Sequence, residues 1–278
     1  LLMDINLPAN HLEFANQSMY EVSQKFLFDY NGDDLRETLI VSRLGSLVLS
    51  LALGIFIYIW AKRLFGEKAG LMALVLSPFN PTILSVSTII GRDLAVTVFI
   101  FTTFYFLWSF YKSGKSTELL LAGLMLGLGQ VTDYPAILAF PLIGFLFVVL
   151  LIMGKGFRFR NSWLNSLVNR FKGDFWRRLS GMVIIFIVLL LLSYVIIIAN
   201  YACSSYGLRG LFRTFEYSLS RDSDISFGDS QKAIASNPLY KALAENVPLP
   251  LPYYYVKGLG FQLGASTGVT GTYATFIV

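Results

Sequence analysis

The sequence predicts an all-α membrane protein, a polytopic transmembrane helical bundle of about six spans with extracytoplasmic loop regions. Hydrophobic residues make up 55% of the chain and charged residues only 14%, and the mean hydropathy is +0.62. A soluble domain is rarely so apolar. The apolar residues also form long runs, whereas a transmembrane β-barrel would need short alternating segments. We therefore predict a bundle of α-helices.

Six apolar runs are the candidate spans: 40–61, 69–91, 94–111, 119–131, 134–153 and 179–202. Most of them reach the roughly 20 residues that a helix needs to cross the hydrocarbon core. The fourth run is too short, so it either borrows polar neighbours or ends below the surface inside a protein-lined cavity. The second option would leave Asp133 recessed. In the same run Gly123 and Gly127 form a GxxxG step, which predicts close packing against another helix.

The loops predict the orientation of the bundle. Segments 62–68, 112–118 and 154–178 together hold 12 of the 22 basic residues but only three of the 17 acidic ones. Positive charge favours the cytoplasmic side of a membrane, so we predict a multi-pass plasma-membrane protein with these segments inside. The net charge of +5 comes from these loops. No basic stripe with interleaved aromatic residues indicates a nucleic-acid partner.

This topology divides the chain into three predicted regions. Residues 1–38 form an extracytoplasmic first-loop region with a surface helix over 17–30. Residues 39–202 form the transmembrane bundle, and 155–178 is a basic amphipathic segment on the cytoplasmic leaflet. Residues 203–278 form an extracytoplasmic loop region rich in Pro, Tyr and Gly.

Two aspartates stand almost alone among apolar residues and are the leading functional candidates. If 94–111 and 119–131 are spans, the chain crosses after Asp93 and returns before Asp133, so both face the extracytoplasmic side. A charge in the middle of a spanning helix costs roughly 2.5–3.5 kcal/mol on insertion scales. Charged residues at this depth therefore favour a functional role.

Structural roles for the same residues stay open beside the functional one. Asp93 begins a helix, where the macrodipole stabilises a carboxylate. Asp133 precedes Tyr134-Pro135, the pattern of an N-cap followed by proline in the first turn. Arg92 is able to pair with a lipid phosphate at the membrane surface. The lone His11 and lone Cys203 offer no zinc site and no disulfide framework.

The order of elements from Arg43 to Leu142 resembles that of a known family. Segment 41–81 has a span, a K/R-LFG turn and a returning span, and 87–108 places an acid at the outer start of a helix. Segment 119–143 is similar to the family's next helix pair, and 248–277 is weakly similar to an external loop. The family is that of GT-C type, polyprenyl-phosphate-dependent glycosyltransferases related to the dolichyl-phosphate-mannose protein mannosyltransferases.

The resemblance implies transfer of a sugar from a polyprenyl-phosphate carrier to a protein, lipid or polysaccharide acceptor on the extracytoplasmic face. In the family a carboxylate acts as general base on the acceptor hydroxyl, and positive groups or a divalent metal stabilise the leaving phosphate. Asp93 matches a supporting acid, and the main base is expected upstream of residue 1 in a longer protein. Arg92, Asp133 and Tyr134 are expected at the substrate or lipid phosphate, and membrane lipids are further partners.

Two departures from the family pattern affect the phosphate site. Thr88 stands where an arginine often precedes the acid, and Asp133 replaces the usual lysine after the short helix. Arg92 and the external Arg209 and Arg213 are the remaining candidates for a cation there. Two other functions stay open: a membrane transporter or lipid-linked flippase that uses recessed Asp93 and Asp133, and a non-catalytic membrane subunit.

Overall fold

The structure is a computed structural model, which describes residues 24–30, 32, 35–88, 91–157, 159–160, 165–166, 168, 170, 173–203 and 255. The chain divides into two compact units, one of residues 43–200 and one of residues 1–42 with 201–278. The second unit is described at the π-helix η2 (Lys25–Tyr30), at the adjoining ends of two long helices and at Tyr255. Most of the predicted first-loop region, most of the cytoplasmic amphipathic segment and nearly all of the predicted tail lie outside the described residues, so these remain predictions.

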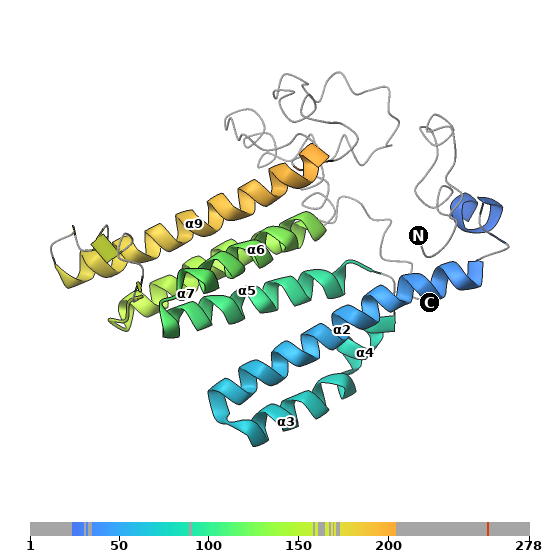
Figure 1. The fold of residues 1–278 in the computed structure, drawn as a ribbon, viewed down its shortest axis with the longest axis horizontal. Helices are drawn as coiled ribbons and strands as arrows, with labels where there is room; N and C mark the ends of the chain where they lie inside the picture. Colours follow the sequence, from blue (N-terminus) through green and yellow to red (C-terminus); the bar gives the residue numbers. More distant parts are fainter. Residues whose placement is uncertain are drawn as a thin grey trace, which may run out of the picture. The chain divides into compact units, whose positions relative to one another are not determined.

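The described residues contain helices and no strand, which confirms the predicted all-α class (Figure 1). After η2 the elements are α2 (Leu35–Phe65), α3 (Glu67–Leu76), η3 (Ser77–Phe79), α4 (Pro81–Thr88), α5 (Asp93–Ser113), α6 (Ser116–Thr132), η4 (Tyr134–Leu138), α7 (Ala139–Ile152) and α9 (Asp174–Cys203). Short turns separate these helices along the chain, and prolines stand at several of the turns.

Four helical stretches of the described chain are long and apolar enough to cross a membrane: Leu39–Phe65, Asp93–Ser113, Tyr134–Ile152 and Asp174–Asn200. Their outer faces carry large apolar side chains that no part of the structure covers. In α2 they include Ile40, Leu44, Leu47, Val48, Leu51 and Ile55, spaced at one to four residues. Such a face suits contact with lipid rather than water, which confirms a membrane protein.

The predicted span 69–91 is not a single helix. α3 ends at Leu76, a 3-10 turn follows, and α4 begins only at Pro81. Pro78 and Pro81 explain the break because proline removes a backbone donor and clashes with the preceding turn. Asn80 has the extended conformation (φ −68°, ψ 119°) that proline imposes on its predecessor. The predicted span 119–131 lies in α6, a continuous helix of 17 residues.

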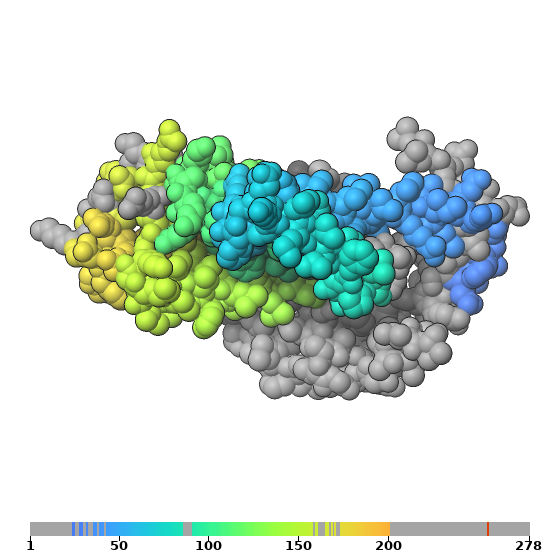
Figure 2. Space-filling view, turned by 90° about the horizontal axis from the view of Figure 1, so that it is seen from below, coloured from blue at the N-terminus to red at the C-terminus, as the bar shows by residue number. Residues whose placement is uncertain are grey.

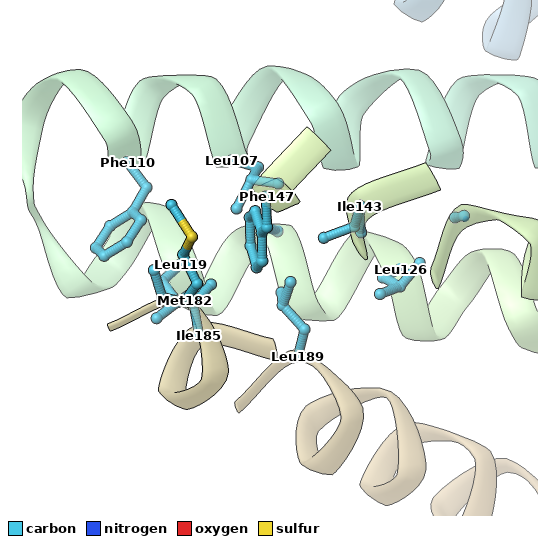
Figure 3. Close-up of a cluster of buried hydrophobic side chains, with 11 residues drawn as sticks. Leu107, Phe110, Leu119, Leu126, Ile143, Phe147, Met182, Ile185 and Leu189 are labelled. Carbon is cyan, nitrogen blue, oxygen red and sulfur yellow. The ribbon is translucent and has the colours of Figure 1, made fainter. Parts of the chain in front are cut away.

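The last four long helices share one hydrophobic core, drawn in Figure 3. Its buried members come from α5, α6, α7 and α9, and they are Leu107, Phe110, Leu119, Ala122, Leu126, Ala139, Ile143, Phe147, Met182, Ile185 and Leu189. A smaller cluster joins α2 to α5 through Leu53, Leu94 and Val98. Figure 2 shows the surface of α2 and α3, coloured blue to cyan, beside the green surface of the later helices. The two clusters hold both ends of α5 in place.

The GxxxG step of α6 is an interhelical contact. A Cβ atom on Gly123 would lie 2.8 Å from the Cβ of Leu192, and one on Gly127 would lie 2.9 Å from the Cβ of Ile196. Both partners belong to α9, and real side chains essentially never approach so closely. The close packing predicted for this step is therefore confirmed, and α9 is the helix that needs it.

Candidate functional site

The candidate site lies at one end of the antiparallel pair α5 and α6. Gly114 makes the reversal between them, because it adopts the left-handed conformation (φ 65°) and donates its N–H to the carbonyl of Phe110. At the other end of the pair, a Cβ on Gly129 would contact the Cβ of Phe99 at 3.4 Å. Late residues of α6 thus lie beside early residues of α5.

This pairing brings the two aspartates to the same end of the bundle. At the helical rise of about 1.5 Å per residue, Asp93 lies about 9 Å beyond Phe99, and Asp133 lies about 6 Å beyond Gly129. The structure therefore places Asp93 and Asp133 at similar levels along the pair. Their neighbours Arg92 and Tyr134 lie at this end with them.

Asp93 is the first residue of α5 and its side chain is exposed. Its carbonyl accepts the hydroxyl proton of Thr97 (2.7 Å), while no described residue forms a hydrogen bond or an ion pair with its carboxylate. Arg92 precedes it and is exposed in the same way. The predicted position at a helix N-terminus is confirmed, and the protein leaves both charged groups accessible. Asp93 is not recessed within the protein.

The side chain of Asp133, unlike that of Asp93, is held by a hydrogen bond to the backbone. This residue is half-buried and extended (φ −158°, ψ 150°), and its carboxylate Oδ1 accepts the backbone N–H of Tyr134 at 2.9 Å. Pro135 follows in the first turn of η4. The capping role predicted from the sequence is therefore confirmed. A further role at the substrate stays a prediction, as does that of the half-buried Tyr134.

Replacing Asp133 separates these two roles. Asp133→Ala removes the cap, and we expect a loss of about 1 kcal/mol in the free energy of unfolding. Asp133→Asn keeps a capping oxygen and is expected to unfold like the wild type. Thermal unfolding in detergent measures both variants. If the asparagine variant is as unstable as the alanine variant, the negative charge matters to the fold and capping is an incomplete explanation.

The described residues do not by themselves fit a divalent metal. Nowhere in the described ranges do three His, Cys, Asp or Glu side chains gather as ligands. Asp93 and Asp133 lie at this end, and Asp133 already accepts a backbone hydrogen bond.

A group of residues at the opposite end of α5 was not among the predicted site residues. Arg63 at the end of α2 donates from Nη1 to Oγ of Ser109 (3.3 Å). Beside this contact is a shallow cavity of about 470 Å³ that is open to the surface and lined by Arg63, Trp108, Ser109, Lys112 and Ser113. The sequence shows basic residues in two separate segments, 62–68 and 112–118. It does not show that Arg63 and Lys112 come together in the fold.

Residues 35–169 match the family model described as dolichyl-phosphate-mannose-protein mannosyltransferase. The matched range contains α2 to α7 and all four predicted site residues, and it confirms the family resemblance drawn between Arg43 and Leu142. No curated protein and no solved structure gave a significant match to the chain.

Proposed function

Because residues 35–169 match the model of the dolichyl-phosphate-mannose-protein mannosyltransferase family, whose members are membrane glycosyltransferases, we propose a specific site for sugar transfer. The donor is a polyprenyl-phosphate sugar, and the reaction takes place where α5 begins and α6 ends, on the extracytoplasmic face. One observation carries this proposal: within the family segment, Arg92, Asp93 and Asp133 come to one end of a single helix pair.

The position suits a donor that is anchored in the membrane. A polyprenyl chain stays among the lipids, so its phosphate and sugar are presented near the membrane surface. Charged groups that receive them belong at the ends of spanning helices rather than at mid-depth, where they are costly. Arg92 and Asp93 meet this requirement because both are exposed where α5, a spanning helix, begins: Arg92 is its N-cap and Asp93 its first residue.

The reaction is a displacement at the anomeric carbon of the sugar. The bond from this carbon to the carrier phosphate oxygen breaks, and its electron pair leaves with the phosphate. A bond forms between the same carbon and the acceptor hydroxyl oxygen, whose proton passes to a carboxylate base. We assign Arg92 to the leaving phosphate, which gains negative charge. Asp93 has the supporting role of orienting the acceptor and the base.

The test uses the protein expressed from its natural coding sequence, reconstituted in vesicles with labelled polyprenyl-phosphate mannose and a membrane extract as acceptor. Wild-type protein is expected to move the label to the acceptor. Arg92→Ala should raise the KM for the donor about 10- to 100-fold, because a hydrogen bond to a charged group contributes about 1.5–3 kcal/mol. Arg177→Ala is the control, since this exposed arginine lies at the start of α9, at the other end of the bundle.

The alternatives give different results in the same vesicles. A flippase or transporter would move the labelled donor across the bilayer without a new covalent bond to the acceptor. A non-catalytic subunit would neither transfer nor transport the label. Either result, obtained with folded protein, contradicts the proposed transferase.

A further inference from the structure

We propose that the cavity between α2 and α5 binds the headgroup of an anionic phospholipid of the surrounding bilayer. Its lining residues on α5 are Trp108, Ser109, Lys112 and Ser113, and α2 contributes Arg63. Ser109 lies 16 residues after Asp93, which is about 24 Å along the helix. The cavity is therefore separate from the transfer site, and the proposal stands whether or not the protein transfers a sugar.

The lining has the chemistry of a phosphate receptor. Arg63 and Lys112 supply two positive charges, and the described residues place no carboxylate within ion-pair distance of either. The neighbouring Lys62, by contrast, is paired with Glu67 at 3.0 Å. Ser109 and Ser113 add hydroxyl groups, which donate hydrogen bonds as well as accept them. Two unpaired cations and two hydroxyls around one space match the oxygens of a phosphate.

The guanidinium of Arg63 is held in position for this task. Its Nη1 donates to Ser109 Oγ, and its Cζ lies 5.4 Å from the centroid of the Tyr105 ring. A guanidinium carries several N–H donors in one plane, so a single bond to a serine leaves others for a ligand. Arginine held by an aromatic face and one hydroxyl is pre-organised to meet a phosphate with two donors.

Helix electrostatics explain the charges only in part. Arg63 and Lys112 lie in the last turns of α2 and α5, where a cation is favoured by the helix dipole. That effect stabilises a cation at each helix end separately. It does not require the two side chains to line one shallow cavity together with two serines and an indole.

The surroundings favour a lipid over a soluble phosphate. Next to Arg63, the side chains of Leu64 and Phe65 are 46% and 79% exposed, so apolar surface adjoins the cationic groups. Trp108 lines the cavity itself, and tryptophan is enriched where membrane meets water. A ligand with a phosphate and acyl chains satisfies both surfaces at once. Basic pockets between membrane helices bind anionic lipid headgroups in this manner.

The experiment that tests this proposal measures lipid binding by native mass spectrometry of the detergent-purified protein. Dioctanoyl phosphatidylglycerol is titrated against the wild type and against the double variant Arg63→Gln/Lys112→Gln. The control is Lys62→Gln/Lys115→Gln, which removes the same charge from the last turn of α2 and from the residue that precedes α6, and leaves the cavity lining intact. We expect the apparent Kd to rise about tenfold or more in the cavity variant and to change less than about twofold in the control.

Arg63→Gln also removes the contact to Ser109, so the single variant Lys112→Gln is measured beside it. Lys112 is exposed, and its replacement is expected to weaken binding about threefold or more without affecting the fold. Equal weakening in the cavity and control variants would overturn the proposal, because it would mean that the whole basic end attracts anions. Equally tight binding of zwitterionic dioctanoyl phosphatidylcholine would also overturn it. Inorganic phosphate that displaces the lipid at equal concentration would show a soluble anion to be the ligand instead.

Discussion

Replacing Asp93 with asparagine is expected to lower sugar transfer about 100-fold or more, at the lower end of what a positioned acid or base contributes. The carboxylate is exposed at the first turn of α5, and no described residue pairs with it. Its charge therefore stabilises the fold mainly through the interaction with the helix dipole, which contributes about 0.3–1 kcal/mol. We expect the variant to reach the membrane folded, with its loss confined to turnover. Labelled transfer in vesicles, normalised to folded protein, measures the effect.

Asp174→Asn is the matched control for this variant. Asp174 is also an exposed acid in the first turn of a spanning helix, and it lies at the opposite end of the bundle. Both substitutions remove the same charge from the same kind of helix position. Asp174→Asn also removes an exposed ion pair with Arg177 (3.3 Å), which contributes about 0.2–1 kcal/mol, so both variants should cost little stability. Only the Asp93 variant should lose transfer. Equal activity of the two variants would leave Asp93 with a purely structural role.

Gly127→Leu is expected to have the largest effect on stability, a loss of about 1–3 kcal/mol in the free energy of unfolding. The first atom of the new side chain would lie 2.9 Å from the Cβ of Ile196 in α9. This partner atom is attached directly to the backbone, so the two helices have to separate. Separation exposes the interface formed by Gly123 and Leu192 as well. Thermal unfolding in detergent, followed by size-exclusion chromatography, measures the loss.

Gly144→Leu in α7 is the control for helix propensity and side-chain size. A Cβ at Gly144 has no atom within 4 Å, so a leucine there should be neutral or slightly stabilising, because it favours helix over glycine. If both variants unfold at the same temperature, the α6–α9 contact contributes little to stability. The interpretation of the GxxxG step as a packing contact would then be wrong.

Local patterns in the sequence predicted the local features of this fold well. The Asp133-Tyr134-Pro135 pattern predicted an N-cap, and the structure confirms it through one hydrogen bond at 2.9 Å. The break within 69–91 was missed although Pro78 and Pro81 stand there. Hydropathy alone predicts one span there, whereas the two prolines indicate a break. A proline acts on its own turn, so that signal was present in the sequence.

Partners distant along the chain could not be predicted in the same way. The GxxxG step indicated a close contact, but only the structure identifies α9, more than 60 residues later, as the helix that fits against it. Arg63 and Ser109 are 46 residues apart, and the sequence placed them in separate elements. Their convergence makes the cavity, which no local pattern indicated.

The sequence by itself determined that this protein is a helical membrane protein and approximately where its long helices lie. The reason is that lipid requires every spanning segment to satisfy its own backbone hydrogen bonds and to present apolar side chains. Those requirements apply to each segment separately, so they can be recognised from a run of consecutive residues. Only the tertiary structure decided which helices pair, because pairing depends on how side chains of distant segments fit together. That fit places Asp93 and Asp133 at one end of α5 and α6, and Arg63 and Lys112 around one cavity at the other.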